Sequence, residues 1–271
     1  MRDLHAIVEG IVQGLTEFLP ISSTAHLRIV PAFFGWPDPG AAFTAVIQLG
    51  TMAAVLLYFR HDLWRIARSW LRSLRDPALR GDLDARMGWY IILGTIPIAI
   101  FGFIFRDQIE TGARNLYLIG SALITLGLVL YAADEVGRRT RTLEQINRDD
   151  GVTIGFAQAL ALIPGVSRSG ATISAGLFRG FDRPSAARYS FLLSVPAVVL
   201  SGVFELRKVG GAHQPDVGAV IIATLVAFVV GYASIALLLR YLVRHTMLLF
   251  VVYRVVLGVV VIALTAGGAI D

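Results

Sequence analysis

Long apolar runs separated by short polar segments dominate the chain. Six of these runs are long enough for a membrane-spanning helix, which needs about 20 residues; they lie at about 41–59, 87–106, 116–134, 184–205, 216–239 and 247–268. None of them shows the period-two alternation of a transmembrane β-barrel strand. The pattern therefore predicts an all-α polytopic membrane protein with about six transmembrane helices.

Two further apolar segments, at about 4–35 and 152–180, are each interrupted by a proline followed by hydroxyl-bearing side chains. The prolines are Pro20 and Pro164. The stretch from Val152 to Val166 is too short for a full crossing, so both segments are predicted to be re-entrant helical hairpins that enter and leave on one side. A helix broken inside a bilayer must be surrounded by protein or by a water-filled cavity. Both breaks therefore mark candidate functional sites.

The basic residues divide unevenly between the two sides that this layout predicts. Of the 24 Lys and Arg residues, 16 lie in the loops 60–86, 135–151, 179–188 and 240–245, five lie in the opposite loops and three lie inside apolar segments. Basic loops face the cytoplasm. Both termini and the opposite loops are therefore predicted to lie outside.

An internal repeat appears when the two broken segments are aligned. Residues 10–13 (Gly-Ile-Val-Gln) match residues 155–158 (Gly-Phe-Ala-Gln), and in the same register Ser22 matches Ser167. The chain is thus predicted to be one transmembrane domain, 1–271, with repeat 1 at about 1–135 and repeat 2 at about 150–271. One hairpin and three crossings in each repeat would invert the second copy, as in transporters whose broken helices meet at the bilayer midplane.

Composition agrees with this class and excludes others. Of 271 residues 56% are hydrophobic and 16% are charged, against roughly 25% charged in soluble proteins. The net charge of +5 is explained by the basic loops, so we expect a lipid bilayer as the partner and no nucleic acid. The absence of cysteine excludes disulfides and thiolate catalysis.

The hydroxyls after each break are predicted to lie at the N-terminus of a second half-helix, where free backbone N–H groups bind anions. The alternative is that they only cap helices. Arg168 adds a guanidinium suited to phosphate oxygens. The candidate phosphate-binding residues are Ser22, Thr24, Ser167, Ser169, Thr172 and Arg254; for Arg254, pairing with Glu17 is the alternative.

Carboxylate and amide side chains form a stripe before the first break. Glu9, Gln13 and Glu17 are four residues apart on one helix face. Oxygen ligands beside a phosphate site suit Mg²⁺ or Ca²⁺, so Glu17 and Gln13 are the candidate metal ligands, whereas Glu9 is expected to be solvated at the hairpin mouth. His26, close to Ser23, is a candidate base or nucleophile.

The strings QGLTEFLPISSTAHL (13–27) and PGVSRSGATIS (164–174), with Tyr-Arg at 253–254, resemble the undecaprenyl-diphosphate phosphatase family, also called the bacitracin-resistance family. The resemblance covers essentially the whole chain. It implies an enzyme of the bacterial inner membrane that hydrolyses undecaprenyl diphosphate to undecaprenyl phosphate on the periplasmic side with a divalent cation, Mg²⁺ or Ca²⁺. The catalytic residues that it implies are Glu17, Ser23, His26 and Arg168.

Several alternatives stay open at this level. Ser23, His26 or a water molecule can be the nucleophile, and a homodimer is compatible with the chain. A polyprenyl-phosphate transporter, or flippase, would use the same inverted-repeat anion site. Because a transporter needs neither nucleophile nor base, His26 beside Ser23 and Glu17 favours the phosphatase.

Overall fold

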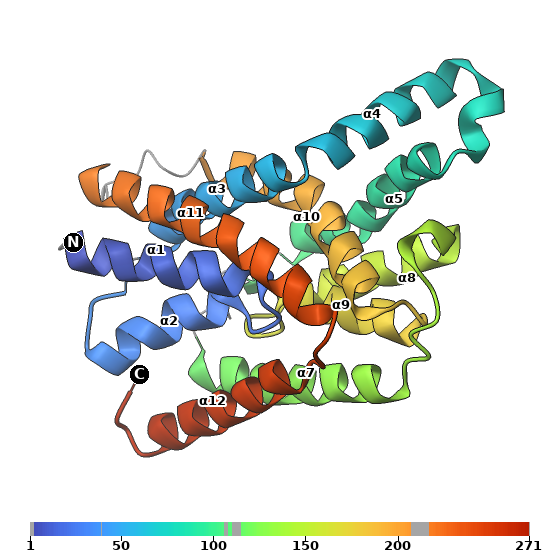
Figure 1. Ribbon diagram of the computed structural model, residues 1–271. Coiled ribbons are helices and arrows are strands. Elements are labelled where there is room, and N and C mark those ends of the chain that lie inside the picture. The colour runs from blue at the N-terminus through green and yellow to red at the C-terminus, as the bar shows by residue number, and fades with distance from the viewer. Residues whose placement is uncertain (1–2, 39, 106–107, 110–114, 207–216, 271) are drawn as a thin grey trace.

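The computed structural model describes residues 3–38, 40–105, 108–109, 115–206 and 217–270, and within them the fold is all-α. The only strand-like contact in these ranges is a single bridge between Arg141 and Phe181. The helices are α1 (Asp3–Phe18), α2 (Ser23–Phe34), α3 (Gly40–Tyr58), α4 (Arg60–Arg75), α5 (Leu83–Ile104), α7 (Leu116–Val136), α8 (Arg148–Ala159), α9 (Arg168–Phe178), α10 (Arg183–Leu206), α11 (Val217–Leu242) and α12 (Leu248–Ala266) (Figure 1). The predicted fold class is confirmed at this level.

Each of the six predicted spans corresponds to one helix: α3, α5, α7, α10, α11 and α12. Within the described residues, α5, α7, α11 and α12 are long and apolar enough to cross a membrane. The bent pair α3 and α4 would add a fifth span if it were one broken crossing. Four or five candidate spans are thus present, and the count of six stays a prediction.

The segment 60–86 was predicted to be a loop, and this prediction is wrong. Most of it is helical: α4 is followed by a 3₁₀ turn, η1 (Pro77–Gly81), and by the start of α5. The segment folds because Leu63, Ile66 and Trp70 recur at helical spacing and pack toward the body of the molecule. The axis of α4 is bent by 72° from that of α3.

Both predicted helix breaks are present and share an unusual backbone conformation. The helix α1 ends at Phe18, ahead of Pro20, and α2 begins at Ser23. In the second segment α8 is followed by η3 (Leu160–Leu162), and α9 begins at Arg168. The residues before the two new helices, Ser22 and Ser167, have φ angles of 76° and 71°. Left-handed backbone at a residue other than glycine stores strain and is concentrated at functional sites.

Glycines let the first helix of each broken segment approach a helix from the other half of the chain. Gly10 of α1 lies against α11, where an added Cβ would come within 2.5 Å of the carbonyl oxygen of Ala223. Gly155 of α8 lies against the backbone of Gly94 in α5, where an added Cβ would clash. The two halves therefore interlock through positions that the sequence repeat aligns.

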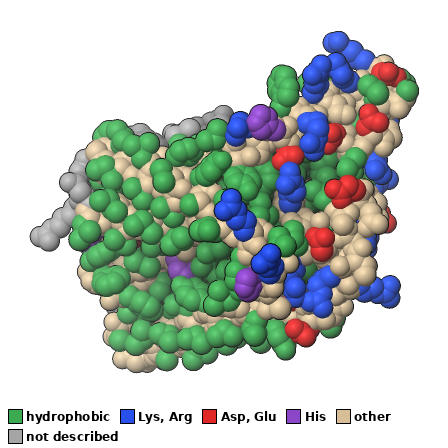
Figure 2. All heavy atoms as spheres, in the orientation of Figure 1, with side chains coloured by type: hydrophobic (Ala, Val, Ile, Leu, Met, Phe, Trp, Pro, Cys, Tyr) green, Lys and Arg blue, Asp and Glu red, His purple; other side chains and the backbone are tan. Residues whose placement is uncertain are grey.

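Polarity is divided between the two ends of the molecule. Both termini lie near one end, beside the start of α1 and the end of α12 (Figure 1). Charged side chains gather at the other end, around α4, the start of α5 and α8, while the face between them is mostly hydrophobic (Figure 2). The largest buried cluster lies between these ends and includes Phe59, Tyr189 and Phe191.

Candidate functional site

The two helix breaks meet in the interior of the molecule. An ion pair joins Arg168 of α9 to Glu17 of α1, with 15% and 7% of the respective side chains exposed. Beside it, the hydroxyl of Ser169 donates a hydrogen bond to the carbonyl oxygen of Leu19 at 3.0 Å. Residues about 150 positions apart in the sequence thereby form one site.

Glu17 is the centre of this site. Its Oε1 accepts from the guanidinium of Arg168, and its Oε2 accepts from the hydroxyl of Ser23 at 2.6 Å and from the amide of Gln13 at 3.2 Å. The same Gln13 amide also donates to the hydroxyl of Thr51 at 3.2 Å. A buried carboxylate is stable as an anion only with such donors. The predicted carboxylate–Arg pair therefore exists, but its partner is Arg168 and not Arg254.

His26 is held away from Ser23 by two other partners. Its Nδ1 lies 2.7 Å from the carbonyl oxygen of Ser22, and its Nε2 lies 2.7 Å from the hydroxyl of Tyr253. A carbonyl can only accept, so Nδ1 carries the proton, and in the neutral ring Nε2 accepts from Tyr253. The rings are nearly parallel, with centroids 5.6 Å apart. The side chain that is hydrogen-bonded to Ser23 is therefore Glu17 and not His26.

The hydroxyls of the second break are buried and bonded within the protein. Ser167 caps α9 by accepting from the backbone N–H of Gly170 at 3.2 Å. Thr172 donates to the carbonyl of Arg168 at 2.8 Å and lies 2.6 Å from the hydroxyl of Ser190. In the first break, Ser22 is buried and lies 3.1 Å from the hydroxyl of Thr24, which is exposed. The structure thus places these residues at the two helix starts, and their binding of phosphate stays a prediction.

Arg254 is completely buried, and its guanidinium is bonded to backbone carbonyls. It donates to Pro20 in the first break at 2.9 Å, and to Gly165 and Val166 in the second break at 3.1 and 3.0 Å. Two longer bonds, of 3.2 and 3.3 Å, reach Leu123 and Ala122 of α7. One side chain from α12 therefore ties both breaks to the body of the protein.

Residues 6–260 match the model of the family described as "Bacitracin resistance protein BacA". The chain belongs to this family. A protein from Nocardioides sp. named undecaprenyl-diphosphatase is 58% identical over 268 residues, covering 98% of each chain. Proteins of the same name from Thermobifida fusca and Mycolicibacterium smegmatis are 52% and 55% identical; both matches cover all of this chain and 92% and 99%, respectively, of the relatives.

Membership of the BacA family confirms the resemblance drawn from the two polar strings, because both strings lie inside the matched range. Together with its apolar helices, it identifies the chain as a multi-pass membrane protein. The site described above lies entirely within the matched region of this BacA-family chain.

A metal site made of protein side chains alone is not present in the described part of this BacA-family chain. Those residues contain no group of three or more His, Cys, Asp and Glu side chains that could hold an ion. What the site offers is the carboxylate of Glu17 and the amide of Gln13, one turn apart on α1. Hard oxygen donors of this kind fit Mg²⁺ when substrate phosphates supply further ligands.

Two interior residues, Glu9 and Tyr253, differ in the structure from what the sequence led us to expect. Glu9 was expected to be solvated, and this is wrong: it is 2% exposed, and among the described residues neither of its carboxylate oxygens has a hydrogen-bond partner. Tyr253 was noticed only as the neighbour of Arg254, although its hydroxyl is the side-chain partner of His26. In the sequence, only the position of Tyr253 next to Arg254 pointed to a role for this residue.

Proposed function

We propose that the chain is an undecaprenyl-diphosphatase, which hydrolyses undecaprenyl diphosphate to undecaprenyl phosphate and inorganic phosphate. This reaction would recycle the lipid carrier of cell-wall synthesis and confer resistance to bacitracin. The relatives' printed name supports the reaction and substrate. The observation that carries the proposal in this molecule is the cluster of Ser23, Glu17 and Arg168 between two helix N-termini.

The chemistry breaks the bond between the terminal phosphorus and the bridging oxygen of the diphosphate. Ser23, or a water molecule that takes its place, attacks the terminal phosphorus. Glu17, whose carboxylate lies 2.6 Å from the Ser23 hydroxyl, either accepts the proton of the nucleophile or holds the cation described below. If Ser23 attacks, undecaprenyl phosphate leaves and a water molecule then hydrolyses the phosphoserine. His26, as base or nucleophile, stays the alternative, since Tyr253 occupies its Nε2 in the substrate-free structure.

Arg168 and the starts of α2 and α9 supply positive potential for the phosphates. A guanidinium binds two phosphate oxygens at once, and helix N-termini direct backbone N–H groups toward an anion. These donors stabilise the charge that builds up on the phosphoryl oxygens in the transition state. Ser22, Thr24, Ser167, Ser169 and Thr172 are proposed to position these helix starts or to contact the phosphates.

A divalent cation, Mg²⁺ or Ca²⁺, is part of the proposal. Glu17 and Gln13 would hold it, and when bound it would neutralise charge on the phosphate oxygens. Because Arg168 already compensates Glu17, the cation is expected to bind together with the diphosphate, which can take over the guanidinium.

We also propose that the two halves form an inverted repeat with two re-entrant hairpins and six crossings. Equivalent positions support it: Ser22 and Ser167 share a left-handed backbone, and Gly10 and Gly155 each meet a helix of the other half. The basic loops favour the bacterial plasma membrane as the location, with the site open to the outer side. A homodimer stays a prediction.

The same architecture would suit a polyprenyl-phosphate flippase. The 2.6 Å contact between a hydroxyl and a carboxylate favours hydrolysis, because transport does not need an activated nucleophile. The decisive experiment measures phosphate release from undecaprenyl diphosphate by the purified protein, with and without a chelator. Lipid movement across vesicles without phosphate release would contradict the proposed enzyme.

A further inference from the structure

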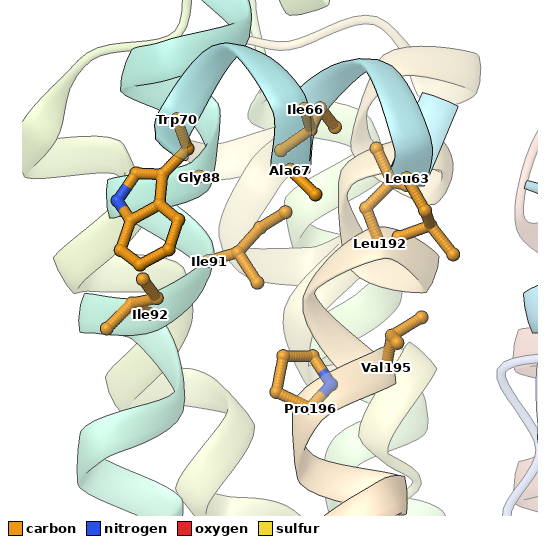
Figure 3. Close-up of a pocket in the computed structure, with 10 residues that line it drawn as sticks. All are labelled: Leu63, Ile66, Ala67, Trp70, Gly88, Ile91, Ile92, Leu192, Val195 and Pro196. Atoms are coloured by element: carbon orange, nitrogen blue, oxygen red, sulfur yellow. The ribbon is translucent and has the colours of Figure 1, made fainter. Parts of the chain in front are cut away.

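An apolar groove lies between α4, α5 and α10, away from the candidate site. Its volume is about 140 Å³, and side chains such as Leu63, Ile66 and Trp70 of α4, Ile92 of α5 and Val195 of α10 line it (Figure 3). All ten lining residues are apolar. A groove of this chemistry suits a hydrocarbon chain.

The helix α4 presents three distinct faces. Leu63, Ile66, Trp70 and Ser73 face the body. Trp64, Ala67, Leu71 and Leu74 follow at the same spacing on the neighbouring face and are exposed; Trp64 is 68% exposed and Leu71 56%. Ala67 also lines the groove, so the exposed apolar face continues into it.

The third face of α4 is basic and lies beside the exposed apolar face. It carries Arg65, Arg68, Arg72 and Arg75. Arg65 forms ion pairs with Asp62 and Asp84. Among the described residues, none forms an ion pair with the other three, which are exposed, and basic side chains gather at this end of the molecule (Figure 2).

The direction of α4 suits a helix that lies in a membrane surface. The bend of 72° turns it nearly perpendicular to α3, and its arginines make a transmembrane position costly. If α3 crosses the bilayer, α4 therefore turns away from the direction of that crossing and lies at the end of the molecule where basic side chains gather. An in-plane helix buries its apolar face in the lipid boundary and presents basic residues to anionic headgroups.

We propose that α4 and the groove form a binding site for an anionic phospholipid. One acyl chain lies in the groove beside Trp70, and the headgroup phosphate lies against Arg68, Arg72 and Arg75. Charge complementarity selects an anionic lipid over a zwitterionic one. The site is separate from the Glu17–Arg168 centre and does not depend on the proposed reaction.

Trp70 provides a reporter inside the groove. A variant with Trp36, Trp64 and Trp89 changed to phenylalanine leaves Trp70 as the only tryptophan. In phosphatidylcholine vesicles, brominated phosphatidylglycerol at low mole fraction is expected to quench Trp70 at least fivefold more effectively than brominated phosphatidylcholine. The attraction of one arginine to an anionic membrane surface, about 1 kcal/mol, corresponds to roughly this factor in affinity.

Two pairs of variants separate the headgroup contact from the groove. R68Q/R72Q/R75Q should abolish the preference for phosphatidylglycerol, whereas R138Q/R139Q/R244Q, which removes three other exposed arginines, should retain it. Ala67→Phe fills the groove and should reduce quenching by both lipids, whereas Leu71→Phe, outside the groove, should not. A Tm in detergent equal to that of the parent protein verifies that each variant is folded.

Three results would overturn the proposal. Equal quenching of Trp70 by both brominated lipids, in the protein that has Trp70 as its only tryptophan, would exclude an anionic preference. Unchanged quenching in Ala67→Phe would mean that the headgroup is bound only at the surface. Relief of quenching by one equivalent of undecaprenyl phosphate would assign the groove to the polyprenyl chain of the substrate or product.

Discussion

Removal of the guanidinium of Arg254 is predicted to reduce stability before it affects catalysis. In Arg254→Leu, five backbone carbonyls lose the hydrogen bond from Arg254. Three of them, in Pro20, Gly165 and Val166, belong to the two helix breaks. A buried polar group left unsatisfied costs about 1–3 kcal/mol. The three break carbonyls alone therefore correspond to roughly 3–9 kcal/mol, a large part of the roughly 5–15 kcal/mol by which proteins are stable.

The assay is thermal unfolding of the purified protein in detergent, with phosphate release measured on the same samples. A loss of 3 kcal/mol is expected to lower the Tm by more than about 6 °C. Arg254→Lys, which keeps the charge but has fewer donors, should lie between the parent protein and Arg254→Leu. Arg244→Leu, which removes an exposed arginine, is the control and should leave the Tm unchanged.

The opposite result would assign Arg254 to the substrate. If Arg254→Leu unfolds within about 2 °C of the parent protein, where 1 kcal/mol corresponds to about 2–4 °C, the carbonyls do not depend on it. A large rise in KM in the same variant would then support the phosphate-binding role predicted from the sequence. Normal stability together with that rise would refute the structural reasoning.

Four further outcomes are expected. Arg168→Lys should lose more than about tenfold in phosphate release, because a point charge cannot replace a bidentate donor. Retention of more than about a tenth of the parent activity would exclude bidentate binding of the phosphate by Arg168. Glu17→Gln should regain part of its rate in excess Mg²⁺ if the carboxylate binds metal, whereas a rate that no metal concentration restores would favour proton transfer. A cysteine at position 76 in this Cys-free chain should resist an impermeant reagent added outside cells; labelling there would reverse the topology. Glu9→Gln should match the parent protein in Tm and activity, because a buried carboxylate without a partner is expected to be neutral; a marked loss would indicate an ionised group.

The helix breaks could be predicted because their causes are local. Proline lacks a donor and clashes with the preceding turn, which favours the end of α1 ahead of Pro20. Hydroxyl side chains favour the N-cap position, and α2 and α9 directly follow Ser22 and Ser167, of which Ser167 accepts a capping hydrogen bond from Gly170. The six apolar runs likewise contain enough information to place six helices to within a few residues.

Contacts that depend on the backbone or on distant segments could not be predicted. The partners of Arg254 are carbonyls, which every residue carries and no sequence pattern marks. Tyr253 and His26 are 227 positions apart, and only the packing of α12 against the first break brings them together. The helix α4 was missed for a different reason: an apolar-run criterion does not detect an amphipathic helix rich in arginine.

The ion pair between Glu17 and Arg168 explains how a charged site can exist inside an apolar protein without its substrate. Each group is costly to bury alone, and each is the counter-ion of the other. In the proposed reaction a diphosphate would compete with Glu17 for the guanidinium, and the carboxylate would then be left with Ser23 and Gln13. It then needs a proton or a cation to compensate its charge. In this proposal substrate binding would prepare Glu17 either to take the proton of Ser23 or to hold a metal, and the rate measured against metal concentration distinguishes these two roles.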